Sequence, residues 1–174
     1  MIATVDELAQ YSGVHTDDDG KSATLYLQAA SDILSSYLGY NPESAEYTKI
    51  FTGTGFQDIR AGVKPITALK SIKIDGAEKN TDDFLLFDDS IYFKAGVFPA
   101  GAKVLVEFQA GFDAEKIPAI MKMTVLRIAA LLQLESDSNI GVSSRSFADS
   151  SRTFLNTVNY DKYLIQCSCY KLLY

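Results

Sequence analysis

Residues 104–135 form the stretch that most limits what this chain can fold into, because several structural signals follow one another there. Val104, Val106 and Phe108 alternate with other residues, which is typical of a strand with one buried face. An Ala-Gly pair then interrupts the pattern, and Pro118 suits the first turn of a helix, where its missing N–H would be unpaired in any case. A long apolar run follows, and it contains no catalytic group. The stretch therefore predicts a scaffold and indicates that the function lies in surfaces rather than in a reaction centre.

Two helices are predicted near the start of the chain. Thr4 and Glu7 have the spacing of a capping box, which predicts a short helix over 5–12 that ends near Gly13. The next helix is predicted over 21–38, where a broad apolar face of the kind that a helical bundle buries recurs at helical spacing. The residues of this face are Leu27, Ser31, Leu34 and Leu38, with Tyr26, Ala30, Ile33 and Tyr37 beside them.

The middle of the chain has a period near two, and turn residues recur in it. Strands are predicted at 47–52, 69–74, 84–87, 91–94 and 103–109. The Asp75-Gly76 pair is a hairpin-turn signal. Helical spacing returns at 118–135 and again at 160–172. The predicted class is α+β: a helical bundle with a small antiparallel β-sheet inserted between the second and third helices.

We expect a single domain over residues 1–174, a length that is sufficient for one core. Its predicted parts are helical segments at 1–42 and 112–174, a β insertion at 47–110 and a long loop at 136–158.

The serine-rich loop 136–158 has no convincing period, and a loop of this length tends to be functional or disordered. It nonetheless carries apolar side chains and arginines for which a solvated linker has little use. Two interpretations stay open. The loop is an arm that orders on contact with a partner, or it lies on its own bundle with Phe147 and Phe154 as anchors. The candidate partner or subunit interface consists of Ile140, Val142, Arg145, Phe147, Arg152, Phe154 and Leu155.

The charge and the apolar runs exclude several classes of protein. A net charge of −6 argues against broad electrostatic binding to nucleic acid, although it leaves open a duct through which DNA passes without sticking. No apolar run approaches the ~18 residues that span a bilayer, so no membrane segment is expected. The start of the chain has no basic end and carries acidic residues, so we expect no secretory leader.

None of the chemical motifs predicts an active site. The acidic run after His15 lacks the spacing of a calcium loop, and the glycines of Thr52–Gly55 are not followed by the Gly-Lys-Ser/Thr of a phosphate loop. A serine nucleophile would need a base, and the chain contains only one histidine that could act as one. Cys167 and Cys169 are two apart in a predicted helix, so we expect two small buried hydrophobes in a reduced compartment. We therefore expect no catalytic residues, no metal and no cofactor.

Three segments, in their order, resemble the head–tail connector, or adaptor, proteins of tailed bacteriophages. The start, residues 4–42, is similar to the opening of that family: a capped helix, an acidic loop and a helix that ends in Tyr-Leu-Gly. Residues 63–76, VKPITALKSIKIDG, are similar to its proline-containing strand and Asp-Gly turn. The segment that begins at Val104 is similar to its strand, Ala-Gly break, Ile-Pro and helix. The resemblance covers most of the chain, and the loop 136–158 lies where the family varies.

The resemblance implies a structural protein of a phage or prophage. Such adaptors assemble as rings, commonly of twelve copies, beneath the portal at the capsid vertex. They extend the DNA channel and dock the tail or stopper protein, so the implied location is the virion head–tail junction, and the host cytoplasm during assembly. The implied partners are further copies of the chain, the portal, and the tail or stopper, with no membrane and no specific DNA binding. Candidate charges for an acidic channel wall are Asp17, Asp18, Asp19, Asp82, Asp83, Asp88 and Asp89.

Two alternatives belong to other classes. A small α+β enzyme or ligand-binding domain with an unrecognised site predicts a concave pocket with convergent polar groups. A DNA-binding accessory protein is disfavoured by the negative charge and by the absence of a basic stripe.

Deleting residues 143–152 separates the two interpretations of the loop. If the segment is an arm, the deletion leaves the melting temperature of the monomer unchanged and abolishes assembly, because the contacts form only with a partner. Thermal unfolding and sedimentation measure the two effects. An unfolded monomer would show instead that the segment belongs to the core.

Overall fold

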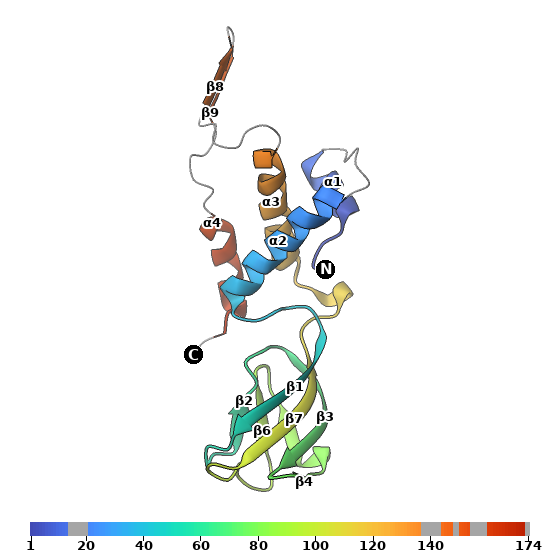
Figure 1. Cartoon of the computed structure of the whole chain (residues 1–174), viewed down its shortest axis with the longest axis vertical. Helices are drawn as coiled ribbons and strands as arrows, with labels where there is room; N and C mark the ends of the chain where they lie inside the picture. The colour runs from blue at the N-terminus through green and yellow to red at the C-terminus, as the bar shows by residue number, and fades with distance from the viewer. Residues whose placement is uncertain (14–20, 137–143, 148–149, 154–159, 173–174) are drawn as a thin grey trace. The chain divides into compact units, whose positions relative to one another are not determined.

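The computed structural model describes residues 1–13, 21–136, 144–147, 150–153 and 160–172, and it confirms the α+β class. The chain divides into two compact units (Figure 1). A helical unit comprises Met1–Tyr37 and Pro118–Lys171, and a β unit comprises Leu38–Ile117 and Leu172–Tyr174. In chain order the strands of the β unit therefore lie between the second and third helices, as the change of period predicts.

The first helix, α1 (Val5–Ser12), has the predicted capping box. The Glu7 amide donates to Thr4 Oγ1 at 3.2 Å, and the Thr4 amide donates to Glu7 Oε2 at 2.8 Å. The helix ends at Gly13, whose φ of 67° lets its amide donate to the Ala9 carbonyl at 2.9 Å. Local sequence thus fixes both ends of this helix.

Two 18-residue helices supply most of the helical core. Helix α2 (Lys21–Leu38) buries the predicted face, and α3 (Ala119–Ser136) is apolar on almost all sides, with contacts to α1 and to the C-terminal helices. The buried residues of the two helices include Ala23, Leu27, Ala30, Leu34 and Leu38 from α2 and Met121, Val125, Ile128 and Ala129 from α3.

The C-terminal helix differs from the prediction. A continuous helix was expected over 160–172, but a single α-turn, α4 (Asp161–Leu164), is followed by a 3₁₀-helix, η3 (Ile165–Tyr170). Tight 3₁₀ turns of this kind are common where a helix ends. Both cysteines are free, and Cys167 is buried as expected, whereas Cys169 is exposed, so the expectation of two buried cysteines was wrong.

The β unit contains two antiparallel sheets rather than the single sheet expected. The first has the order β1 (Ala45–Thr52), β7 (Lys103–Ala110), β3 (Ile66–Ile74) and β4 (Ala77–Glu78). The second has the order β2 (Asp58–Arg60), β6 (Ser90–Phe93) and β5 (Phe84–Leu86). The five predicted strands correspond to β1, β3, β5, β6 and β7. The two strands missed, β2 and β4, have three and two residues and are too short to show a period.

Strand β7 is central to the larger sheet, and its alternating residues fill the core as predicted. Val104, Val106 and Phe108 are fully buried. Phe108 also stacks on Tyr47 of β1, with ring centroids 5.5 Å apart. The pairing with β1 is regular over eight residues, whereas the pairing with β3 is interrupted by two register shifts. In Figure 1 this sheet lies in front of the three-stranded one.

The β3–β4 hairpin turns at the predicted Asp75-Gly76 pair. Both residues have positive φ, 48° and 82°, as a two-residue type I′ turn requires. Asp75 Oδ1 also accepts a hydrogen bond from the Lys103 amide at 2.8 Å, which ties the turn to the start of β7.

The second sheet is held by an aromatic cluster. Phe84 lies 4.7 Å from Phe93 and 6.0 Å from Phe98, measured between ring centroids. Phe98 is fully buried, and the turn that carries it fits closely against the end of β1. A Cβ at Gly53 would lie 2.0 Å from the Pro99 carbonyl oxygen, so the glycines that resemble a phosphate loop serve this close approach.

The edges of the larger sheet are protected against pairing with another strand. At one edge β4 has only two residues, and β3 beside it is bulged. At the other edge Lys49 of β1 lies on the inner face and donates from Nζ to the Ala61 carbonyl at 2.8 Å. Burial lowers the pKa of Lys49. An added strand would bury this ammonium further, and short strands, bulges and inward charges are the usual devices that prevent edge pairing.

The long loop contains a hairpin that the sequence analysis did not predict. Strands β8 (Ser144–Phe147) and β9 (Ser150–Thr153) pair antiparallel. Serine occurs in both strands and loops, so a serine-rich sequence does not reveal such short strands. Four residues are also too few to show a clear alternation.

Replacing Leu34 with alanine tests the buried face of α2. Leu34 is fully buried, so the substitution should lower the free energy of unfolding by ~2–5 kcal/mol through lost burial and a residual cavity. Leu25→Ala is the matched control, because Leu25 lies on the same helix and is 64% exposed. Denaturant unfolding measures both. Equal losses for the two variants would show that the helix buries a different face.

One ion pair joins α1 to α3 and makes stability depend on pH. Glu7 Oε1 accepts from Lys122 Nζ at 2.7 Å. This bond, followed by the one from the Thr4 amide, lowers the pKa of Glu7 below its ordinary value of 4.5. Because the pKa is lower in the folded state, the ionised carboxylate stabilises the fold above pH 4.5, and this contribution is lost as the pH falls through the folded pKa.

Glu7→Gln should therefore lower stability at neutral pH by up to about 1 kcal/mol and flatten the loss of stability on acidification. Glutamine retains the capping box, so the change reports the charge rather than the cap. Melting temperatures across the acidic range measure the effect. Superimposable pH profiles for the two proteins would contradict it.

Candidate functional site

Only part of the predicted interface lies within the described residues. Arg145 and Phe147 belong to β8 and Arg152 to β9, where the register pairs Arg145 with Arg152. The remaining members, Ile140, Val142, Phe154 and Leu155, lie outside the described residues, as do His15 and the acidic run after it.

A groove on the helical unit is the first described surface with the shape of a binding site. It has a volume of about 280 Å³ and lies between the end of α1, the second half of α3 and α4. Leu134 at its rim is 52% exposed, although it belongs to a helix that is otherwise largely covered. The lining residues are Tyr11, Ser12, Arg127, Ala130, Leu131, Gln133, Leu134 and Tyr163.

Arg127 is the charged residue of this groove, and its guanidinium is held in place. Its Cζ lies 5.6 Å from the centroid of the Tyr163 ring, and its Nη1 donates to Gln166 Oε1 at 3.2 Å. Lys162 places a second cation 4.7 Å from the same ring centroid. Among the described residues, no carboxylate forms an ion pair with Arg127. The groove therefore combines apolar walls with an oriented positive charge.

A knob on the β unit is the second such surface. We define it as residues 85–89, which comprise the end of β5 and the turn that leads to β6. Leu85 and Phe87 are 44% and 53% exposed, and the Asp88 side chain is 68% exposed. Asp88 Oδ2 lies 3.8 Å from Lys64 Nζ, near the outer limit of an ion pair, and the Lys64 side chain is only 16% exposed. The knob thus presents apolar side chains beside a carboxylate.

Neighbouring segments hold the knob rigidly. The Phe87 amide donates to the Ser90 carbonyl at 2.9 Å, and the Asp88 carbonyl accepts from the Ile66 amide at 3.0 Å. The Phe87 ring meets Tyr92 edge to face, with centroids 6.2 Å apart. A turn fixed in this way loses little conformational freedom on binding.

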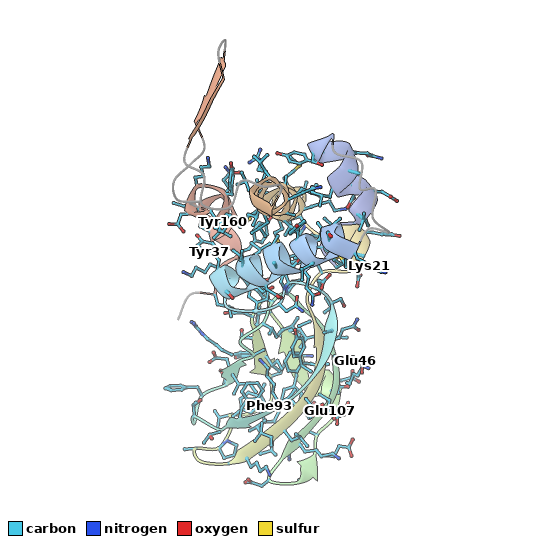
Figure 2. All side chains as sticks on the ribbon, turned by 45° about the horizontal axis from the view of Figure 1, so that its top comes forward. Lys21, Tyr37, Glu46, Phe93, Glu107 and Tyr160 are labelled. Atoms are coloured by element: carbon cyan, nitrogen blue, oxygen red, sulfur yellow. The ribbon has the colours of Figure 1, made fainter. Side chains whose placement is uncertain are left out.

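The outward face of the four-stranded sheet is polar and internally paired. Glu46 and Glu107, labelled in Figure 2, lie on the exposed positions of β1 and β7. Glu46 forms an ion pair with Lys70, and Glu107 accepts from Ser71 Oγ at 2.8 Å. The face also carries one exposed apolar side chain, Ile50, at 62%, but its two glutamates already have partners within the chain.

The described residues offer little to catalysis. They contain no group of three or more metal-binding side chains. Burial raises the pKa of the Cys167 thiol, which lies 3.4 Å from Thr124 Oγ1 in the helical core, so this thiol is held in its unreactive protonated form. No helix among the described residues is long and apolar enough to cross a membrane.

The sequence analysis missed both the groove and the knob, although each has a signal. Arg127 is an isolated cation within the apolar run of α3, and a buried helix has no evident use for it. The signal of the knob is the alternation of the apolar residues Leu85 and Phe87, which two aspartates follow directly.

Comparison with protein families gives a match to the family described as head completion protein, over residues 1–162. Comparison with curated proteins gives no match.

Solved structures with the same fold come from gene transfer agent (GTA) particles. A chain from the neck of an empty particle, computed with C6 symmetry, has a TM-score of 0.64 and 15% identity, over 98% of this chain and 89% of that one. A chain from the virion of the native particle gives 0.64 and 14% over 98% and 89%. A chain from the native neck, computed with C12 symmetry, gives 0.63 and 14% over 98% and 88%. At these identities the likeness shows a shared fold.

Proposed function

The chain belongs to the head completion protein family, and we propose that it is a structural connector that joins the head to the tail of a phage or prophage particle. The match over residues 1–162 carries this proposal, because it spans both units rather than one of them. The order of the three resembling segments in the sequence points to the same role.

The described surfaces support a structural role over the alternative of an enzyme or ligand-binding domain. The groove, at about 280 Å³, is at the small end of the range of about 300–1,000 Å³ that small-molecule pockets occupy. Arg127 is oriented in it, but the lining residues supply no carboxylate, histidine or cysteine as an acid, base or nucleophile. Apolar walls with one oriented charge suit a protein partner better.

The proposed assembly is a ring, which in the virion has twelve copies. The neck structures that share the fold were computed with C6 and C12 symmetry, which is compatible with such a ring. In this proposal the ring lies at the head–tail junction beneath the portal protein, extends the DNA channel and docks the tail or stopper protein. Subunits wait in the host cytoplasm before assembly. A chain with a net charge of −6 lets DNA pass without holding it.

The parts of the chain have separate tasks in this proposal. The helices act as one bundle that carries the sheets as an insertion. The segment around the β8–β9 hairpin, with the interface residues assigned to it by sequence, serves as the arm that orders on contact with a neighbouring subunit, the portal or the tail partner.

Mixing the purified chain with the portal protein encoded beside it tests the proposal. We expect a stable complex in which the number of added copies matches the portal ring, about twelve, with no enzyme activity or cofactor needed. Electron microscopy and native mass spectrometry measure the ring and its stoichiometry. A chain that stays monomeric with the portal present would contradict the role, and tight, salt-sensitive binding to random duplex DNA would contradict the passive channel.

A further inference from the structure

The groove of the helical unit has chemistry that the described residues leave unmatched. Its walls are apolar, Leu134 and Tyr11 at its rim are exposed, and Arg127 points its charge at no described carboxylate. Lys162 beside the same Tyr163 ring adds a second positive charge. Two cations around one ring favour a carboxylate between them, because it offsets their mutual repulsion. The complementary partner is therefore an apolar side chain with a carboxylate next to it.

The knob of the β unit is such a partner. Phe87 and Leu85 supply exposed apolar side chains, and Asp88 supplies the carboxylate. The groove volume of about 280 Å³ is suited to one or two side chains of this size rather than to a larger ligand. Buried aromatic anchors beside a paired charge are typical of the centre of a protein interface.

We propose that the knob of one copy of this chain docks into the groove of the next copy, with Phe87 between Leu131 and Leu134 and Asp88 beside Arg127. The inference rests on the proposed function, since it takes the neighbouring protein to be another copy in a ring.

The difference between the two surfaces explains why the contact leads to more than a two-fold dimer. Knob and groove are different surfaces, carried by different units of the chain. A contact between unlike surfaces is heterologous, so every docked copy still presents one free knob and one free groove. Addition stops when the rotation between copies closes a ring, the outcome that the proposed function requires. A two-fold dimer would instead require one surface to bind itself.

The other described surfaces fit this role less well. Lys49, the two-residue strand β4 and the bulges of β3 protect the edges of the larger sheet, and its outward face carries charges that are already paired. Phe56 is even more exposed than Phe87, at 70%, but has no carboxylate immediately beside it in the sequence. It therefore serves as a control.

Photo-crosslinking of the full chain tests the contact directly. Benzoylphenylalanine is placed at position 87, and the labelled chain is mixed at high concentration with isotopically heavy chain, so that links between copies are identified by mass. We expect links from position 87 of one copy to the segment 127–134 of another, and few from the same probe at position 56. A probe at position 134 should link to 85–89 of another copy. If position 87 forms no link to another copy's groove, or if position 134 links mainly to 154–158 of its own chain, the proposal is wrong.

Charge reversal tests the pairing itself. Arg127→Glu should lower the yield of these links about tenfold or more, because it places like charges at the contact. Adding Asp88→Arg to the same chain should restore most of the yield. Lys162→Glu is the graded comparison, since it makes the same change of charge beside the same Tyr163 ring but outside the groove lining, and it should lower the yield of links less than Arg127→Glu does. Retained melting temperatures show that each variant is folded. Equal effects of the two reversals, or no rescue, would overturn the specific pairing.

Mixing two defective chains tests the head-to-tail geometry. Arg127→Glu disables the groove and Phe87→Asp disables the knob, so each variant alone should remain monomeric. A mixture retains one working knob and one working groove, and should therefore stop at heterodimers. A mixture that forms no dimers, or that forms full rings, would contradict a heterologous contact through these residues.

The outcomes separate this inference from the proposed function. Rings that form on the portal without any link between knob and groove would disprove the inference and leave the connector role intact. Knob-to-groove links in a chain that never joins the portal would support the contact and disprove the role.

Discussion

The pairing of β7 with a strand on each side is the constraint on which the β unit depends. Because β1 and β3 both hydrogen bond to it, the alternation of its residues decides which side of the sheet becomes the core. The end of the strand is equally fixed. A Cβ at Gly111 would lie 2.3 Å from the Glu43 carbonyl oxygen, and the Gly111 amide donates to the Pro65 carbonyl at 2.8 Å. The chain therefore leaves the sheet at a defined point.

The regular elements were predictable because their patterns are long enough to be seen. An 18-residue helix repeats its apolar face several times, and the eight residues of β7 alternate over four pairs. The three residues of β2 and the four of each hairpin strand in the long loop show no comparable repetition. The separation into two sheets could not be predicted either, since hydrogen-bond partners depend on contacts between residues that are distant in sequence.

The candidate surfaces were harder to predict than the fold, for a physical reason. Arg127 becomes notable only when Tyr163 and Gln166, which are nearly forty residues away in the chain, are seen to hold it. Phe87 has the character of a core residue in the sequence, and only its 53% exposure shows that it is not one. Surfaces arise from what the fold leaves uncovered, whereas periodicity reports what the fold covers. The interface predicted in the long loop remains a prediction.

Lys49 has a consequence for the way in which many copies can coexist. Where many copies of a chain gather, their local concentration is high, and exposed strand edges then favour fibrils. The half-buried ammonium of Lys49 is hydrogen-bonded to the Ala61 carbonyl. It makes the eight-residue edge strand β1 a poor template for pairing with a strand of another copy. It costs the isolated molecule some stability, because burial disfavours the charged form. At this edge, association through side chains is therefore favoured over association through the backbone.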